Sequence, residues 1–231
     1  MQNEILNRLK GNIIISVQAM PNEPLYEEIC INALIKSVIN GGAKGLRVAG
    51  ARDTKNAKQI APDLPLIGIT KPDKIPTNYK ELVYITPTIS DAEKIIEAGA
   101  DIIAFDATAR NRNSKENLYQ LIQFIKSKGK LAMADISTFE EGIMNACLGA
   151  DILSTTLSGY TTYSETTSTT PDFKLVEKLS KTTNIPVILE GRVWTPEEVK
   201  QGFGAGAFAV VIGSAVTRPQ LITRRFVKAI G

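Results

Sequence analysis

Residues 186–219 read PVILEGRVWTPEEVKQGFGAGAFAVVIGSAVTRP, and this stretch predicts two strand-and-helix units in succession. Two apolar runs rich in β-branched residues end in Glu190 and in Gly213-Ser214, and a Thr-Pro pair followed by two glutamates between them is typical of a helix start. Two consecutive turns of this kind form the phosphate site of many (β/α)8 barrels, after the seventh and eighth strands. The stretch therefore predicts the closing units of such a barrel.

The rest of the chain shows the same alternation of short apolar runs and amphipathic segments, which is typical of a parallel sheet. The strands are expected at 12–17, 45–48, 66–70, 102–105, 131–134, 152–156, 186–190 and 207–212. The helices are expected at 23–40, 54–61, 90–98, 115–128, 138–148, 172–181 and from Thr195, with an extra strand considered at 82–85. The length of 231 residues suits one barrel of about 250 residues. We therefore predict an α/β fold, a (β/α)8 TIM barrel that forms a single domain over residues 1–231.

A Gly-Ala pair precedes each even-numbered strand, starting at Gly42, Gly99, Gly149 and Gly206. We expect each glycine to end the preceding helix, and each alanine to let that helix lie close to the sheet. This repeat supports the count of eight strands and implies no chemistry.

The composition excludes several classes of function. The formal net charge is only +3 and the basic residues are scattered, so no nucleic-acid partner is expected. No apolar run has the length of a membrane span or a signal-peptide core, so we expect a cytoplasmic protein without a membrane partner. The absence of histidine removes Ser-His and Cys-His nucleophile pairs and His-ligated zinc. Cys30 and Cys147 have no partner at metal or redox spacing, and both are expected to be buried.

The carboxyl ends of the odd-numbered strands each offer a polar side chain, namely Gln18, Lys71, Asp135 and Glu190. These ends converge on one mouth of a barrel, where active sites lie. Arg47 on the second strand is expected to join them. Asp106 on the fourth is expected either to join them or to bind backbone amides of its own turn.

A lysine beside carboxylates and an arginine suits the removal of a proton next to a carbonyl group. Lys71 is a base only if burial or a neighbouring cation such as Arg47 lowers its pKa. A Schiff base on Lys71 is a competing use of the same amine. We expect backbone amides at Gly191 and Gly213-Ser214, helped by Arg192 or Arg218, to hold a phosphate.

The chain resembles the N-acetylmannosamine-6-phosphate 2-epimerases over almost its whole length. The motifs that carry the resemblance are SVQAMPNEPL from Ser16, GGAKGLR from Gly41, LIGITK from Leu66, FDAT from Phe105, MADIST from Met133, STTLSGYT from Ser154, LEGR from Leu189 and VIGSAVTRP from Val211. The resemblance implies a (β/α)8 barrel that interconverts two N-acetylhexosamine 6-phosphates in sialic acid salvage, without a metal or nucleotide cofactor.

By the same resemblance, Lys71 and Glu190 match the catalytic residues of that family. The substrate-binding positions that it implies are Gln18, Arg47, Asp135 and Arg218. The expected ligand is a small-molecule phosphosugar, and a homodimer is considered as the assembly.

Two other functions stay open from the residues. A barrel isomerase or synthase for another phosphosugar would keep the phosphate site and change the acid–base residues, and a non-catalytic module would bind a phosphosugar without turnover. The Thr/Ser-rich loop at 161–171 departs from the family pattern. It is expected to be mobile, as a cover for the mouth or as a surface insertion.

Overall fold

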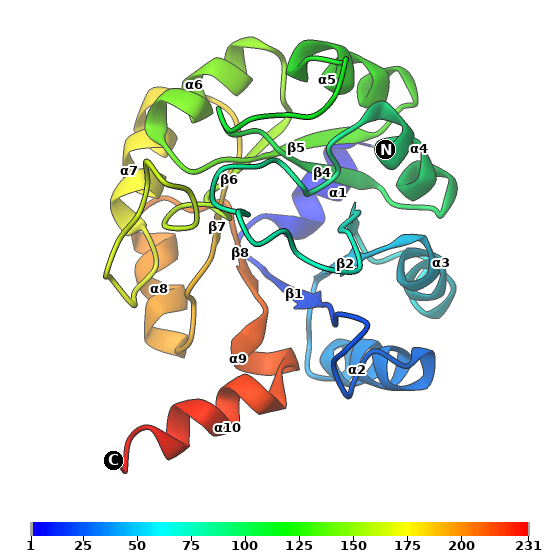
Figure 1. Cartoon of the computed structure of the whole chain (residues 1–231), viewed down its shortest axis with the longest axis vertical. Coiled ribbons are helices and arrows are strands. Elements are labelled where there is room, and N and C mark those ends of the chain that lie inside the picture. The colour runs from blue at the N-terminus through cyan, green and yellow to red at the C-terminus, as the bar shows by residue number, and fades with distance from the viewer. Residues whose placement is uncertain (1, 231) are drawn as a thin grey trace.

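Eight parallel strands close into a barrel in the order β1 to β8, which confirms the predicted (β/α)8 fold (Figure 1). The computed structural model describes residues 2–230, so the first and last residues of the predicted domain lie outside the described range. The strands are β1 Ile13–Val17, β2 Gly45–Ala49, β3 Leu66–Ile69, β4 Ile102–Asp106, β5 Leu131–Asp135, β6 Ile152–Ser154, β7 Val187–Glu190 and β8 Ala209–Ile212. The helices are α1 Gln2–Leu9, α2 Glu28–Asn40, α3 Ala51–Ile60, α4 Ile89–Glu97, α5 Leu118–Ser127, α6 Phe139–Cys147, α7 Phe173–Thr182, α8 Pro196–Gly204, α9 Ser214–Thr217 and α10 Pro219–Val227.

The inside of the barrel is filled by apolar side chains from the strands. Ile14, Ile67, Met133 and Ile188 belong to one buried cluster there, together with Leu9 at the end of α1. Because Leu9 is fully buried against these residues, α1 closes the end of the barrel opposite the carboxyl ends of the strands. The open mouth therefore lies at the other end, as the sequence predicts.

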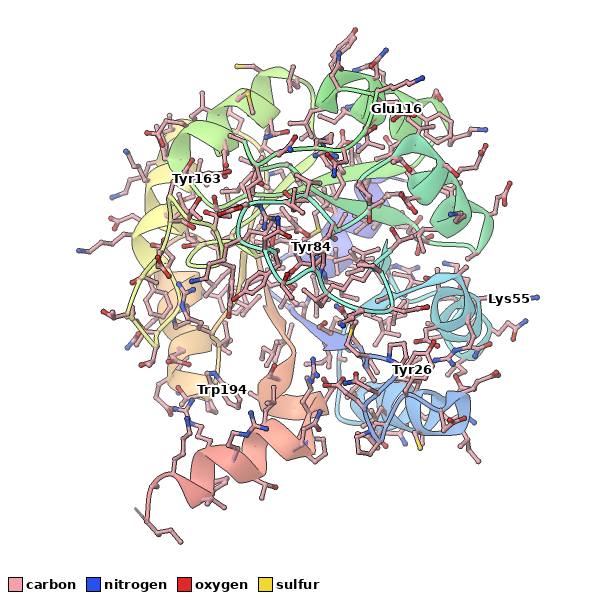
Figure 2. The ribbon with its side chains drawn as sticks, in the orientation of Figure 1. Tyr26, Lys55, Tyr84, Glu116, Tyr163 and Trp194 are labelled. Atoms are coloured by element: carbon pink, nitrogen blue, oxygen red, sulfur yellow. The ribbon has the colours of Figure 1, made fainter. Side chains whose placement is uncertain are left out.

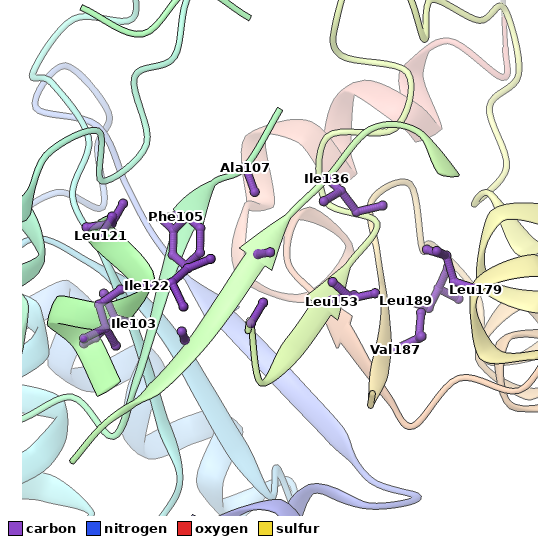
Figure 3. Close-up of a cluster of buried hydrophobic side chains, with 14 of the residues drawn as sticks. Ile103, Phe105, Ala107, Leu121, Ile122, Ile136, Leu153, Leu179, Val187 and Leu189 are labelled. Carbon is purple, nitrogen blue, oxygen red and sulfur yellow. The ribbon is translucent and has the colours of Figure 1, made fainter. Parts of the chain in front are cut away.

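A second apolar layer lies between the strands and the surrounding helices. Figure 3 shows Ile103 on β4 beside Ile122 on α5, and Leu189 on β7 facing Leu179 on α7. All four side chains are almost completely buried. Burial of this layer stabilises the packing of the helices against the barrel.

The four Gly-Ala pairs have the structure that the repeat predicts. Gly42, Gly99, Gly149 and Gly206 have φ angles of 97°, 102°, 95° and 95°, the left-handed region where a helix ends readily on glycine. The alanine that follows each glycine is buried against the sheet. The predicted start of α8 is also confirmed, since Thr195 caps the helix and forms a capping box with Glu198.

Several predicted element limits are wrong. The helix expected from residue 23 begins at Glu28, because the proline at position 24 and the turn that Glu23 closes on the Met20 amide keep the chain irregular there. The helix expected from 115 begins after Asn117, which caps it. The segment 82–85 is not a strand, because only Leu82 makes a single bridge, to Asn111.

The prediction for the two cysteines is also wrong. Cys147 is exposed and Cys30 is only partly buried. Both side chains lie on the side of their helix that faces away from the core. Residue type alone does not predict on which side of a helix a cysteine lies.

The C-terminal helix α10 extends away from the barrel (Figure 1). None of its residues is buried. Trp194, in the turn after β7, lies between the barrel and this helix in Figure 2, and the guanidinium of Arg225 stacks 4.8 Å from the centre of its ring. Exposed apolar side chains near the end of the chain include Phe226, Val227 and Ile230.

Candidate active site

The alternation of side chains along a strand determines which polar residues enter the barrel. Met133 on β5 and Ile188 on β7 belong to the inner core, so Asp135 and Glu190, two residues further on, point the same way. The same step of two brings further strand-end positions to the mouth, namely Gln18, Arg47, Lys71, Thr156 and Gly213. The predicted convergence of polar strand ends follows from this periodicity.

Arg47 lies at the centre of a buried charge cluster. Its Nη1 and Nη2 donate to the two carboxylate oxygens of Asp135 at 3.1 and 2.5 Å, and Nη1 also donates to Glu190 Oε2 at 2.8 Å. Burial alone would lower the pKa of Arg47, but the charges of Asp135 and Glu190 raise it above its ordinary value. Arg47 therefore stays charged, and its ion pairs stabilise the cluster. We call Arg47 and Asp135, which are 1% and 0% exposed, the floor of the site.

Lys71 follows β3 and lines the cavity at the mouth of the barrel. Its Nζ donates to Gln18 Oε1 at 2.8 Å, and Gln18 Nε2 donates to Ser16 Oγ at 2.8 Å, which fixes the amide of Gln18. Burial and the nearby charge of Arg47 lower the pKa of Lys71 to about 8. A neutral amine is therefore accessible near neutral pH, as a general base requires.

Glu190 ends β7 and is mostly buried, with 12% of its side chain exposed. Burial raises the pKa of Glu190, the charge of Arg47 opposes that shift, and the charge of Asp135 adds to it. The site thus brings together an amine with a lowered pKa and a carboxyl with a raised pKa, which suits acid–base chemistry.

A cavity of about 360 Å³ opens above the floor, a volume in the range of small-molecule sites. Of the predicted site residues, eight line it, namely Gln18, Lys71, Glu190, Gly191, Arg192, Gly213, Ser214 and Arg218. Arg47 and Asp135 do not line it: both are buried, and Nη1 and Nη2 of Arg47 bind Asp135 and Glu190, while its Nε has no hydrogen-bond partner among residues 2–230. Their contact with a substrate stays a prediction.

The glycine-lined wall of the cavity lies after the last two strands, where the sequence predicts it. Gly191 has φ +104°, a conformation that favours glycine, and Arg192 beside it has φ +59°. The guanidinium of Arg192 donates to the carbonyl oxygens of Ser158 and Thr170, so in this structure it binds the loop after β6. Arg218 pairs with a Glu23 oxygen.

Arg218 keeps an unused donor. Its Nε is buried and has no hydrogen-bond partner among residues 2–230. Burial lowers the pKa of Arg218 below its ordinary value. Since an anion would satisfy this donor and favour the charge, Arg218 is better prepared than Arg192 for a phosphate group.

Asp106 takes the second of the two roles considered for it. Its Oδ1 accepts from the amide and the hydroxyl of Thr108, at 3.1 and 2.7 Å, and its carboxylate pairs with Arg110. Burial raises the pKa of Asp106, although these partners oppose the shift. Asp106 orders its own turn and does not line the cavity.

The structure adds cavity residues that sequence reasoning missed, namely Ser16, Thr156, Tyr160, Val193, Trp194, Val211 and Thr217. Thr156 ends the predicted sixth strand, whereas the polar residues expected at the mouth lie on the odd-numbered strands and, with Arg47 and Asp106, on the second and fourth. Its position two residues after Ser154, itself an inward residue, is the signal that would have found it.

The loop 161–171 is attached to the body at several points. Thr161 and Pro171 at its ends are buried. The amide of Thr162 donates to the carbonyl of Lys80 at 3.3 Å, and Lys80 pairs with Glu165. The predicted mobility of the loop stays a prediction, and its connection to Arg192 places it beside the cavity wall.

None of the helices between residues 2 and 230 combines the length and the apolar composition that crossing a lipid bilayer requires. Over the same residues, no three His, Cys, Asp or Glu side chains are grouped in a way that would hold a metal ion.

The fold and the site together define a (β/α)8 barrel protein whose ligand cavity lies at the carboxyl ends of the strands. The family model described as "Putative N-acetylmannosamine-6-phosphate epimerase" matches residues 31–231. This chain belongs to the N-acetylmannosamine-6-phosphate epimerase family, which confirms the resemblance found in the motifs.

Relatives and solved structures agree with this assignment. A Clostridium perfringens protein called "Putative N-acetylmannosamine-6-phosphate 2-epimerase" is 46% identical, with 96% of this chain and 98% of the relative covered. One of the same description from Clostridioides difficile is 45% identical, covering 98% and 99%. The structure of the N-acetylmannosamine-6-phosphate 2-epimerase from Clostridium perfringens superposes with a TM-score of 0.91 at 44% identity, covering 97% of this chain and 96% of that one. Thiamine phosphate pyrophosphorylase from Pyrococcus furiosus, at 14% identity and a TM-score of 0.62 over 98% of both chains, shares the fold alone.

Proposed function

We propose that this protein interconverts N-acetylmannosamine 6-phosphate and N-acetylglucosamine 6-phosphate, as a step of sialic acid and amino sugar catabolism. The observation that carries the proposal is the amine of Lys71 at the cavity wall, with a pKa lowered to about 8 beside a carboxyl of raised pKa. This pair suits the removal of a proton next to a carbonyl group. Membership of the epimerase family supports the choice of substrate.

The reaction begins with opening of the sugar ring, because only the open-chain aldehyde makes the C2 hydrogen acidic. Glu190 gives a proton to the ring oxygen as the bond from C1 to that oxygen breaks, and it takes one from the C1 hydroxyl as the aldehyde forms. Lys71 then accepts the proton of C2, and the electron pair of the C–H bond moves to give the enolate. Return of a proton to the other face inverts C2.

Arg47 acts on the enolate from beneath the cavity. Its charge is buried, so water screens its field only weakly, while the paired carboxylate of Asp135 cancels part of that field. Asp135 holds Arg47 in place. The predicted direct contact of either residue with substrate would require the ion pairs of the floor to rearrange.

A proton NMR time course with N-acetylmannosamine 6-phosphate tests the proposal. Growth of the N-acetylglucosamine 6-phosphate signals, to the same final ratio from either sugar, is the expected result. Another phosphosugar that turned over while both of these stayed unchanged would contradict the choice of substrate. Binding of the sugar phosphate without turnover would contradict the assignment as an enzyme.

The pH dependence of kcat/KM is expected to report Lys71. The base must be neutral, and the pKa of Lys71 is about 8, so kcat/KM should rise as pH increases, by about tenfold per pH unit on the acid side. Above that pKa the amine is already neutral, so kcat/KM should level off, and it should fall again where Glu190 loses the proton that ring opening needs. A profile that is flat from about pH 6 to 9 would mean that another group is the base.

Arg218→Ala is expected to damage turnover of the phosphorylated sugar by about a hundredfold in kcat/KM, because the fixed phosphate positions C2 for proton removal. The exposed Arg224 provides the matched control: Arg224→Ala should leave kcat/KM unchanged. Free N-acetylmannosamine should be a poor substrate for the wild type and should lose little more in Arg218→Ala. An equal loss with both sugars would show that Arg218 does not bind the phosphate.

A homodimer and a cytoplasmic location are further proposals. The exposed apolar side chains of Phe226, Val227 and Ile230 support a second copy as the partner of the chain end. Sedimentation equilibrium with the purified protein, and fractionation of cells that produce it, would test these two proposals.

A further inference from the structure

Thr156 occupies the point where the two carboxyl groups of the site meet. Its Oγ1 lies 2.7 Å from Asp135 Oδ1 and 3.1 Å from Glu190 Oε2. The hydroxyl of Ser154 lies 2.8 Å from the same Oγ1. Ser154 is fully buried and Thr156 lines the cavity, so the Thr156 hydroxyl lies between the core and the site.

The same two carboxylate oxygens also share a donor on their other side. Arg47 Nη1 lies 3.1 Å from Asp135 Oδ1 and 2.8 Å from Glu190 Oε2. An Nη1 group has two hydrogens and can donate to both oxygens, whereas a hydroxyl has one hydrogen and two lone pairs. Whether both contacts of Thr156 with the carboxyl oxygens can be hydrogen bonds therefore depends on the protonation of Asp135 and Glu190.

If both carboxyls are ionised, Thr156 can donate to only one of them, and a hydrogen bond donated to Glu190 would lower the pKa of that carboxyl. The other oxygen then faces a hydroxyl lone pair at hydrogen-bond distance, in a buried site where such a contact is unfavourable. If Glu190 carries a proton on Oε2, it donates to Thr156, and Thr156 donates to Asp135. The second lone pair of Thr156 then accepts the hydroxyl hydrogen of Ser154, and every short contact becomes a hydrogen bond.

We propose that Thr156 is a positioning residue that keeps the proton on Glu190, by accepting from Glu190 Oε2 while it donates to Asp135 Oδ1. Its kinetic consequence rests on the proposed epimerisation, because it makes Glu190 the acid that starts ring opening. The assignment of the hydrogen bonds does not depend on the substrate.

The charged groups that face Glu190 come from three other strands. They are Arg47 on β2, Lys71 after β3 and Asp135 on β5. A substitution of Thr156 leaves all three in place, so a change in the titration of Glu190 reports the hydroxyl. In Thr156→Val the protonated pair loses two hydrogen bonds and the ionised pair loses one, so the pKa of Glu190 should fall.

The test is a ¹³C NMR titration of protein labelled at the glutamate carboxyl carbons, with the Glu190 signal assigned by its absence in Glu190→Gln. We expect the pKa of Glu190 in Thr156→Val to fall by about one unit or more, and Thr156→Ser to restore the wild-type value. Thr155→Val is the matched control, because the Thr155 hydroxyl binds only the backbone of Glu190, at 3.0 and 3.1 Å. It should leave that pKa in place.

A rise in the pKa of Glu190 in Thr156→Val would show that Thr156 donates to an ionised Glu190, and would overturn the proposal. An unchanged pKa would overturn it as well. If Thr156→Val does not fold, Thr156→Ala removes the same hydroxyl with less bulk and has the same expected shift.

Turnover provides the second measurement. We expect kcat to fall about tenfold in Thr156→Val, with KM within about twofold, and Thr156→Ser to recover most of the loss. A wild type without turnover would contradict the proposed function and leave the titration to decide on Thr156. A normal kcat in Thr156→Val together with a lowered pKa of Glu190 would overturn the kinetic part of the proposal.

Discussion

Lys71→Met is expected to abolish both epimerisation and the exchange of the C2 hydrogen with solvent, a loss of about a thousandfold or more, or roughly 4 kcal/mol in transition-state stabilisation. Methionine keeps much of the bulk of lysine and removes the amine, so the cavity keeps its shape and loses its base. The measurement is deuterium incorporation at C2 during turnover in deuterated water, followed by proton NMR.

Glu190→Gln separates the two steps of the reaction. If Glu190 only opens the ring, a substrate analogue held in the open-chain form should still exchange its C2 hydrogen in this variant. If a correctly folded Lys71→Met protein exchanged the C2 hydrogen at the wild-type rate, the assignment of Lys71 as the base would be wrong. The same result would exclude a Schiff base on Lys71.

Lys71→Met should also be more stable than the wild type at neutral pH. The pKa of Lys71 is lowered to about 8 in the folded protein, so the unfolded chain binds this proton more tightly, and burial of Lys71 costs stability below that pH. The cost disappears as pH rises toward the unfolded value. Allowing for the open cavity, we expect a gain of about 1–2 kcal/mol in the free energy of unfolding near pH 7. A gain in stability combined with the loss of turnover would separate the chemical role of the amine from any role in folding.

Arg47→Met is expected to lower the free energy of unfolding by about 3–5 kcal/mol, because it leaves the carboxyl groups of Asp135 and Glu190 without their cation. Urea denaturation measures this loss. Without the cation the folded protein should retain carboxyl protons that the unfolded chain releases, so the loss should shrink as pH is lowered. Turnover should fall with it, since the field on the enolate is removed.

A double variant provides the control for this prediction. Arg47→Met with Asp135→Asn removes one of the two uncompensated charges, and it should regain a part of the lost stability without regaining turnover. If Arg47→Met alone were as stable as the wild type at neutral pH, the ion pairs of the floor would not be needed to hold the barrel together.

The fold and half of the site were predictable for a local reason. Each strand is a short apolar run, and a polar residue after it, such as Lys71 or Glu190, marks the end that faces the mouth. The pairing of Arg47 with Asp135 could not be predicted, because these residues are 88 positions apart and meet only once the barrel has closed with its particular stagger. The engagement of Arg192 with the loop after β6 depends on backbone carbonyls, which leave no mark in the sequence.

Thr156 and Cys147 illustrate opposite errors. Thr156 looks like an ordinary threonine at a strand end, and only its neighbours across the barrel give it two carboxyl partners. Cys147 looks like a core residue, and the rotation of α6 turns it outward. In both cases the position in the fold, and not the residue type, determines the surroundings of the side chain.

The buried floor also limits how such a barrel can diversify. We expect the exposed residues at 165–170 to be exchangeable with little effect on folding, so that a new ligand specificity can arise beside the cavity there. Arg47 and Asp135 form at once the last layer of the core and the base of the catalytic cavity. A chain that changes only one of them leaves a buried charge without its partner, so we expect the two residues to change together and more slowly than the exposed loop.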